Sequence, residues 1–458
     1  MCETALETSC PLHKIKCVGF DGNYETRKSA EVLDFNSNSI ANICIAPPIY
    51  IHELVETARS RSVLDLKDIQ RAIQRSADIF LYETIEGLTS DDYVMLTHRA
   101  TGLPKSVIQC SIGYIANALK NIGDTVQLSL PVGMSYDLIG ENAINGTAIL
   151  SRKGDVLSVI AAGNGPGLHA LWPQAVAMGY KTVVKPSNSE PFTAQRLVKA
   201  MILAGLNDYV SLCCTDHQGT RALIDDTDLS IIYGSKTSVA LYANNPNVLV
   251  QGPGHSKVVI TSEIDEDESI GLAAESIMSL GGAACVSASV VYVEGDVKKY
   301  ASRLAEFFSN EVLYEQYPKV ALEKIEIFKT MLEEYQSDGN FGFKTIQTDD
   351  GTILAPYVDY SLKNCEKLKN RELPFPCVVV LPLNKQTIAK DLKGSLSVSI
   401  FSRNKNLIQE ILQQPNIGNV YIGAIPTTWM AMNVPHDGYL SEFLVKSRGY
   451  RIQEKLIF

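Results

Sequence analysis

Short apolar strands alternate with helices over most of this chain. From about residue 147 onward, segments such as "VLSVIAA", "KTVVKP", "LSIIYG" and "ASVVYVEG" are apolar along nearly their whole length, and segments with helical periodicity separate them. Strands that are apolar on both faces are typical of parallel sheets covered by helices on both sides. The alternation therefore predicts an α/β fold with doubly wound parallel sheets.

The length and the earlier part of the chain extend this prediction. A chain of 458 residues is too long for one ordinary core, so it predicts two or three domains. Residues 51–119 follow a helical period, with Ser90 as a predicted N-cap, whereas residues 1–37 show no clear period. From Thr125 the segment "TVQLSLPV" alternates and predicts a strand.

Composition excludes several classes of function. The net charge of −10 argues against nonspecific nucleic-acid binding, which needs a positive field. No apolar run is long enough to cross a bilayer, and the first residues contain no secretory segment, so we expect a cytoplasmic protein with no membrane span and with reduced cysteines. The ten cysteines show no CxxC spacing, and the adjacent Cys213 and Cys214 make a poor clamp, so no metal site is expected.

Several polar residues fall where predicted strands end and helices begin, which is where parallel sheets bind ligands. The segments are "AAGNGPGLH", "VVKPSNSEP" and "IIYGSKTS", and the residues are Asn164, Lys185, Ser187, Asn188, Gly234 and Ser235. Free N–H groups at a helix N-terminus favour phosphate. On its own, each such residue is more often a helix cap or a solvated turn residue, and the dinucleotide fingerprint G-x-G-x-x-G is absent.

The order of five segments carries a family resemblance. The segments "VVKPSNSEP", "GS" after a strand, "QGPGHSKVVI", "GGAACVSASVVYV" and "ELPFPCVVV" follow one another as they do in the aldehyde dehydrogenase superfamily, over roughly residues 125–440. More narrowly, the chain resembles the fatty acyl-CoA reductases typified by the bioluminescence reductase that makes long-chain aldehyde.

The resemblance implies an aldehyde-dehydrogenase-like fold with two doubly wound domains and a small β flap. Residues 1–124 and 150–250 would form a cofactor-binding domain, and residues 251–428 a catalytic domain. Residues 125–149 and 429–458 would form the flap through which the chain makes a homodimer or a homotetramer.

Cys285, in "GGAACVSASVV", is the candidate nucleophile. Its residue type and small neighbours also fit an inert core residue. In the family that the chain resembles, a glycine stands three residues before the nucleophile, and Gly282 reproduces this spacing. The resemblance further assigns the Asn164 amide and the Cys285 backbone N–H to the oxyanion hole that attack on a carbonyl requires.

The resemblance also implies a nicotinamide cofactor. Lys185 matches the lysine that bonds the adenosine ribose, Ser235 would lie by the pyrophosphate, and Glu372 matches the glutamate that holds the nicotinamide ribose. Asn188 stands where the family commonly has a glutamate that grips both ribose hydroxyls. Loss of that carboxylate removes repulsion against a 2′-phosphate, and Lys185 and Ser187 supply a charge and a donor, so NADPH is favoured while NADH stays possible.

Gln251 is the main departure from the family pattern. Oxidising members have "ELGG" where this chain has "QGPG", and their glutamate activates water for deacylation. An amide cannot take a proton near neutral pH. His255 remains open as a substitute base or a buried histidine, and His436, beside Asp437, as a substrate contact or a turn residue.

These features favour reduction of an acyl thioester, either acyl-CoA or an acyl carrier protein adduct, to an aldehyde through an acyl-cysteine at Cys285. Two alternatives stay open. NAD(P)-dependent oxidation of an aldehyde to a carboxylate predicts a working base that replaces Gln251. A non-catalytic binding protein on the same fold predicts an unreactive Cys285.

Overall fold

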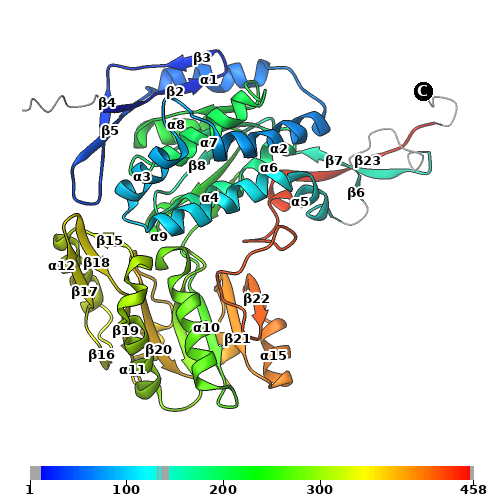
Figure 1. The fold of residues 1–458 in the computed structure, drawn as a ribbon. Coiled ribbons are helices and arrows are strands. Elements are labelled where there is room, and N and C mark those ends of the chain that lie inside the picture. The colour runs from blue at the N-terminus through cyan, green and yellow to red at the C-terminus, as the bar shows by residue number, and fades with distance from the viewer. Residues whose placement is uncertain (1–11, 132–133, 136–143, 454–458) are drawn as a thin grey trace, which may run out of the picture.

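Two seven-stranded sheets with helices packed on them dominate the structure (Figure 1). The structure is a computed structural model, and it describes residues 12–131, 134–135 and 144–453. The central strands of both sheets run parallel. The α/β fold with parallel sheets that the sequence predicts is therefore confirmed.

The first sheet has the strand order β12-β11-β8-β9-β10-β2-β3. Its first five strands run parallel, and β2 and β3 form an antiparallel hairpin at the edge. The strands are β12 (Val248–Gln251), β11 (Leu229–Tyr233), β8 (Val156–Ile160), β9 (Lys181–Lys185), β10 (Val210–Leu212), β2 (Cys17–Gly19) and β3 (Gly22–Tyr24).

Helices pack on this sheet because each has one apolar face. Ile69, Ile73 and Phe80 recur along one side of α2 and are fully buried, so the helical period of residues 51–119 builds a real layer. The α2 helix packs on α7, which lies against the sheet, and α1 packs on α8. The helices are α1 (Pro48–Ser60), α2 (Leu66–Tyr82), α3 (Ser90–Thr101), α4 (Lys105–Lys120), α6 (Pro173–Ala177), α7 (Phe192–Leu203), α8 (His217–Asp226) and α9 (Lys236–Ala240).

The second sheet has the order β16-β19-β20-β14-β13-β21-β22, and all its strands except β16 run parallel. The strands are β16 (Gly339–Asn340), β19 (Tyr357–Tyr360), β20 (Cys377–Pro382), β14 (Ala288–Val293), β13 (Ser256–Ile260), β21 (Ser397–Phe401) and β22 (Asn419–Ile422). Its helices are α10 (Glu266–Met278), α11 (Val297–Phe308), α13 (Cys365–Leu368), α14 (Ile388–Asp391) and α15 (Lys405–Leu412). Beside it lie α12 (Leu322–Glu333) and a small sheet of β15 (Lys319–Val320), β18 (Gly351–Leu354) and β17 (Thr345–Thr348).

A third sheet projects from the body at the right of Figure 1. It contains β6 (Met134–Ser135), β7 (Thr147–Arg152) and β23 (Val445–Tyr450), the last of which follows α16 (Leu440–Leu444). β7 and β23 pair antiparallel along six residues each, so segments far apart in sequence meet here. Parts of the predicted flap, residues 132–133, 136–143 and 454–458, lie outside the described residues, and its role in oligomerisation stays a prediction.

The strand predicted from Thr125 is wrong at its start. Residues there belong to α5 (Ile122–Leu128), which follows α4 directly. Ile122, Thr125 and Val126 are buried, and their spacing of three and four is that of a helix. The segment "TVQLSLPV" is too short to distinguish a strand period of two from a helical period of 3.6 residues. The helical period becomes visible only when Ile122 is included.

The structure adds two local findings, of which the second corrects a prediction. Residues 1–37 contain β1 (His13–Ile15), β2, β3 and β4 (Ser29–Leu33), which are too short to display a period; β1 and β4 flank β5 (Ser39–Cys44) in a small sheet. The N-cap of α3 is Thr89 rather than Ser90, because the Thr89 hydroxyl accepts the Asp92 backbone N–H and the Asp92 carboxylate accepts the Thr89 backbone N–H.

Glu190 is a buried carboxylic acid in the turn before α7. Its Oε1 accepts hydrogen bonds from the backbone N–H (2.9 Å) and the hydroxyl (3.1 Å) of Thr193, while its Oε2 is buried without a hydrogen-bond partner. Burial raises the pKa of Glu190 to about 7 from its usual 4.5. Between these two pH values the folded protein holds a proton that the unfolded chain has released, so this group lowers stability as the pH rises through that window.

Glu190→Gln should remove this pH dependence. Gln keeps an acceptor for Thr193 and cannot ionise, so we expect the stability of the variant, relative to the parent, to increase by roughly 2–3 kcal/mol between pH 5 and pH 8. Urea denaturation at both pH values measures it. Glu275→Gln, at an exposed position of α10, is the matched control and should leave the difference near zero. Parallel curves for Glu190→Gln and the parent would contradict the assignment.

Candidate active site

Cys285 lies in the loop between α10 and β14, and this loop begins with a turn of left-handed backbone conformation. After α10, the short 3-10 helix η3 (Ser279–Gly282) contains three residues with positive φ: Leu280 (60°), Gly281 (84°) and Gly282 (71°). Glycine adopts this conformation without the penalty that a side chain brings. Gly282, singled out by its spacing from the nucleophile, is therefore a residue that the turn into the Cys285 loop requires.

The backbone of Cys285 is fixed from the opposite side by the segment that enters β13. The Ser256 hydroxyl donates to the Cys285 carbonyl oxygen (2.9 Å). Gly254 packs so closely that a Cβ there would collide with the same carbonyl oxygen and lie 2.8 Å from the carbonyl carbon. The Cys285 side chain is half-buried, and this burial, with the charges of Glu372 and Asp437, raises the pKa of its thiol to about 12. At neutral pH the sulfur therefore carries its proton.

His436 is the group that contacts this sulfur. Its Nε2 lies 4.0 Å from the Cys285 Sγ, and the Asn419 side-chain amide holds its loop by donating to the His436 carbonyl oxygen (2.6 Å). Burial lowers the pKa of His436 to about 4, so the imidazole is neutral at pH 7 and has a nitrogen free to accept a proton. The structure therefore places His436 beside the candidate nucleophile, and its role there stays a prediction.

Asn164 reaches the same loop from the first sheet. It follows β8, and its Nδ2 donates to the Ala283 carbonyl oxygen over 3.3 Å. The side chain is exposed, so it has a second amide hydrogen available. The structure therefore brings Asn164 within two residues of Cys285 along the loop, and its role in an oxyanion hole stays a prediction.

Glu372 and His255 clamp the segment beside the nucleophile loop. The Glu372 carboxylate accepts the His255 backbone N–H at 2.6 Å, and its Oε2 lies 3.8 Å from the His255 Nδ1. Burial raises the pKa of Glu372 to about 7 and lowers that of His255 to about 4. His255 has φ 46°, an uncommon conformation for a side chain of this size. Glu372 thus supports the loop as well as being a candidate cofactor ligand.

Lys257 is a buried residue beside the candidate site that sequence reasoning missed. It is fully buried in β13, and its Nζ donates to the His255 carbonyl oxygen (2.9 Å) and to the Ser395 hydroxyl (2.7 Å). Burial lowers its pKa to about 8. The signal was present in "SKVVI", where a lysine interrupts an otherwise apolar strand and so needs partners.

Sequence reasoning also missed Arg371, whose buried ion pair fixes the backbone next to Glu372. It is fully buried next to Glu372 in the chain, and its guanidinium pairs with the Asp359 carboxylate, which also accepts the Ser337 hydroxyl at 2.6 Å. A buried pair of this kind fixes the backbone around it because breaking it leaves an unpaired charge. Between Glu372 and the Cys285 loop lies a small pocket whose walls include Gly282, Ala284 and Phe375.

Five of the six predicted cofactor residues end or follow strands at one edge of the first sheet, whereas Glu372 lies before β20 of the second sheet. Lys185 ends β9, Gly234 and Ser235 follow β11, and both strands flank β8, which leads to Asn164. The Lys185 Nζ is 3.5 Å from the Asn188 Oδ1, and burial lowers its pKa. The remaining contacts are local: the Ser187 hydroxyl bonds that of Ser189 (2.9 Å), and Ser235 caps α9 by accepting the Ser238 N–H (3.4 Å).

Gln251 sits at the end of β12, the edge strand of the same sheet. Its backbone carbonyl accepts the Gly234 N–H at 3.1 Å. Among the described residues its side chain makes no hydrogen bond, and its role stays a prediction. The structure brings His436 and Asn164 to the Cys285 loop, and it places Gln251 with the cofactor residues.

A known protein family matches the part of the chain that holds this cysteine, the Asn164 amide and the strand edge. The model of the aldehyde dehydrogenase family matches residues 153–450, more than half of the chain. The chain belongs to the aldehyde dehydrogenase family. It is thus an oxidoreductase of a family that uses NAD(P) cofactors.

Relatives of this aldehyde dehydrogenase family member are distant in sequence. It is 22% identical to the 2-hydroxymuconic semialdehyde dehydrogenase of Pseudomonas sp. (strain CF600) over 449 residues, 88% of this chain and 90% of that protein. It is also 22% identical to the betaine aldehyde dehydrogenase of Sinorhizobium fredii (strain NBRC 101917 / NGR234) over 290 residues, 57% of this chain and 60% of that protein.

Solved structures share the fold. The lactaldehyde dehydrogenase of Escherichia coli superposes with a TM-score of 0.78 at 16% identity, covering 97% of this chain and all of that one. An NAD+ complex of an aldehyde dehydrogenase from Bacillus cereus superposes with a TM-score of 0.78 at 18% identity, covering 96% and 97%. The expected aldehyde-dehydrogenase-like fold is therefore confirmed.

The narrower resemblance to fatty acyl-CoA reductases finds no support, because the relatives named above are dehydrogenases of aldehydes. No helix in the described part of the chain is both long and apolar enough to cross a lipid bilayer.

Gly254→Ala should disable the site while leaving the fold intact. The added methyl group displaces the Cys285 carbonyl, and a displacement of about 1 Å costs on the order of 100-fold in rate. We expect the rate of Cys285 alkylation by iodoacetamide, followed by peptide mass spectrometry, to change. We expect the turnover rate to fall by about 100-fold. Gly271→Ala, in α10 where a methyl group meets no neighbour, is the control. Unchanged turnover in a folded Gly254→Ala protein would show that the close contact is dispensable.

Proposed function

We propose that this chain oxidises an aldehyde to a carboxylate with NAD(P)+ through a covalent adduct on Cys285. The contact of the Cys285 sulfur with the neutral His436 imidazole, at 4.0 Å, is the observation that carries the proposal. It supplies the base that Gln251 cannot be. The names of the relatives favour the same reaction. This places oxidation ahead of the thioester reduction favoured by the sequence alone.

The first half of the reaction uses the thiol and the amide. His436 takes the proton of Cys285, and the thiolate attacks the aldehyde carbon to give a tetrahedral thiohemiacetal. Asn164, with a backbone N–H of the loop, donates to the oxygen on which negative charge develops. Without His436 the attack would need direct ionisation of a thiol whose pKa is about 12. The neutral imidazole removes that requirement because it receives the proton as the bond forms.

The second half releases the product. NAD(P)+ supplies, when bound, an acceptor for the hydride that leaves the thiohemiacetal carbon. The resulting acyl-cysteine is a thioester, and His436, once its proton has passed to solvent, draws a proton from the attacking water. The balance is one aldehyde, one water and one oxidised cofactor giving one carboxylate, one reduced cofactor and two protons.

The residues at the strand edge fit a dinucleotide. Lys185 has one long contact, with Asn188, and so keeps ammonium protons for ribose hydroxyls. Glu190, the nearest acid after Asn188, points into the protein and is bonded to Thr193, so it does not replace the missing ribose-binding carboxylate. Ser187, two residues after Lys185, and Ser235, after β11 at the same edge, supply hydroxyl donors. This set favours acceptance of a 2′-phosphate, and hence NADP+ as well as NAD+.

Acyl-thioester reduction is the second candidate, and Gln251 favours it. An amide at the position of the family's water-activating glutamate slows hydrolysis of an acyl-cysteine, which preserves that intermediate for reduction to an aldehyde. The substrate would then be acyl-CoA or an acyl carrier protein adduct, with NADPH as the reductant.

A product assay decides between the two. The purified chain is given a panel of aldehydes with NAD+ or NADP+, and separately a panel of acyl-CoA thioesters with NADPH, and products are identified by mass spectrometry. We expect carboxylate and reduced cofactor in equal amounts from the first panel and none from Cys285→Ser. If the thioester panel yields aldehyde and the aldehyde panel yields no carboxylate, the chain is an acyl-thioester reductase and the proposed oxidation is wrong. No turnover and no acyl adduct on Cys285 in either panel would leave only the binding protein.

His436→Gln should change both the rate and its pH dependence. In the parent, His436 is neutral above about pH 5 because its pKa is about 4, so adduct formation at Cys285 should vary little between pH 6 and 8. In the variant the thiol must ionise alone, so the rate should drop about 10- to 100-fold at pH 7 and then rise close to tenfold per pH unit. Rapid-mixing measurements with an aldehyde substrate report both, and His217→Gln, at an exposed position, is the control. A variant with the parent's flat profile would exclude His436 as the base.

A further inference from the structure

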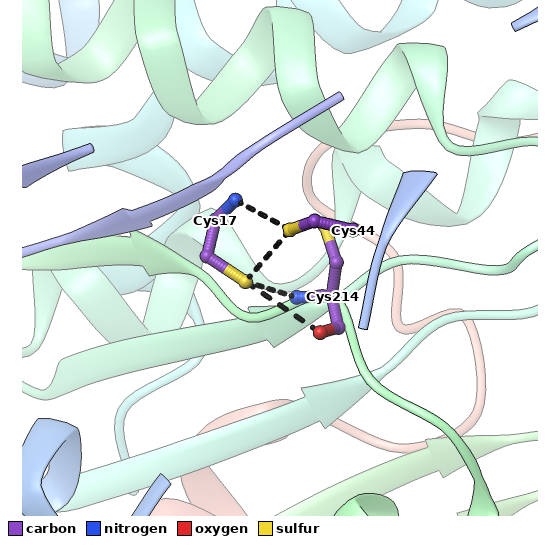
Figure 2. Close-up of side chains that lie close together, drawn as sticks. All are labelled: Cys17, Cys44 and Cys214. Carbon is purple, nitrogen blue, oxygen red and sulfur yellow. Dashed lines mark hydrogen bonds between the residues drawn. The ribbon is translucent and has the colours of Figure 1, made fainter. Parts of the chain in front are cut away.

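Three cysteines from separate parts of the chain converge inside the first domain. Cys17 lies on β2, Cys44 ends β5, and Cys214 follows β10. Their sulfur atoms all lie within 4.8 Å of one another, and the Cys17 and Cys44 sulfurs are 3.4 Å apart (Figure 2). All three residues are buried. They are remote from Cys285 in sequence and take no part in the proposed reaction.

The backbone supplies hydrogen-bond donors to two of these sulfurs. The Cys17 N–H donates to the Cys44 Sγ (3.1 Å), and the Cys214 N–H donates to the Cys17 Sγ (3.2 Å), as the dashed lines in Figure 2 mark. In a metal complex, N–H donors of this kind bond the thiolate ligands, whereas in the free site the Cys17 thiol also donates to the Cys214 carbonyl oxygen (3.5 Å). Buried cysteines that only fill space need no such donors, because a thiol behaves as a small apolar group.

We infer that Cys17, Cys44 and Cys214 form a binding site for a thiophilic metal ion, and that the three-sulfur set selects Cu+. A metal ion bound to three thiolates at about 2.3 Å in one plane holds the sulfurs about 4 Å apart, so the three sulfurs, all within 4.8 Å of one another, reach this spacing when the 3.4 Å Cys17–Cys44 pair opens slightly. Soft thiolate ligands select Cu+, Zn2+ and iron–sulfur clusters. Zn2+ in structural sites takes four ligands, and the described residues bring only these three to the cluster.

The surroundings suit an ion that is held away from water. Tyr24 and Tyr50 stack with ring centroids 3.7 Å apart, and burial raises the pKa of Tyr50. Lys185, at the end of the strand next to Cys214, is the neighbouring cation, and the charge of Cys214 acts on its pKa. It offsets part of the negative charge that three thiolates and one Cu+ carry.

Metal binding at this site has to displace protons. A neighbouring thiol raises the pKa of Cys44 to about 12, and burial raises that of Cys214. Cys44 and Cys214 are therefore thiols at neutral pH in the free site, and binding of Cu+ releases their protons into solution. The bonds that form are three copper–sulfur bonds, those that break are sulfur–hydrogen bonds, and no electron is transferred.

A competition titration tests the inference on the full chain. The reduced protein is added anaerobically to the bathocuproine disulfonate complex of Cu+, and the loss of the complex's colour measures the copper withdrawn. We expect the parent to withdraw one more equivalent than Cys44→Ser, with the affinity at this site reduced at least about 100-fold in the variant. Cys213→Ala is the matched control, since Cys213 is equally buried and adjacent in sequence but outside the cluster, and it should match the parent.

A second measurement guards against misfolding of Cys44→Ser. X-ray absorption of the copper-loaded parent should give three sulfur neighbours at roughly 2.3 Å. Equal copper withdrawal by all three proteins, or nitrogen and oxygen neighbours in the absorption spectrum, would overturn the inference. Tighter binding of Zn2+ than of Cu+, measured with a chromophoric zinc chelator, would overturn the choice of ion.

Discussion

Residues 252–255 join the two large sheets, and the reactive centre depends on how this crossing is packed. The segment leaves β12 in the first sheet at Gln251 and enters β13 in the second at Ser256. On the way, Gly254 touches the Cys285 carbonyl and accepts the Leu396 N–H (2.7 Å). Because the crossing contacts both the nucleophile loop and the strands of the second sheet, it fixes where the sulfur lies relative to the cofactor edge.

Burial sets the charge state of the reactive groups before any ligand binds. Burial shifts the pKa of Cys285 to about 12, that of Glu372 to about 7 and that of His436 to about 4. Each shift favours the uncharged form of the group. A pair of neutral thiol and neutral imidazole carries no standing charge that must be desolvated. Charge then develops only during attack on the carbonyl, where Asn164 can meet it, and differential stabilisation of this kind is what accelerates a reaction.

Sequence reasoning succeeded where information is local or ordered along the chain. The alternation of strands and helices gave the fold, and the segments around Lys185, Gly234 and Cys285 all fall at one edge or loop of the expected kind. It failed where contacts join distant residues. His436 was named as a possible substrate contact, but its contact with Cys285 spans 151 positions, and that of Cys214 with Cys17 spans 197, so no spacing rule could show either contact. Lys257 differs, since a lysine inside an apolar strand was readable as a residue that needs buried partners.

Backbone strain and hydrogen bonding together indicate which side of the site has to move. His255 and Leu280 adopt left-handed conformations that side chains avoid, and both flank the Cys285 loop. His255 is held in this state from both sides, by Glu372 at its N–H and by Lys257 at its carbonyl. The backbone beside Cys285 is thus held by several hydrogen bonds at once. A sulfur–nitrogen distance of 4.0 Å has to shorten for proton transfer, as catalytic contacts do when substrate binds. In the described part of the chain, the hydrogen bond that fixes His436 is the one its carbonyl oxygen accepts from the Asn419 side chain, so we expect the approach to come from the His436 loop.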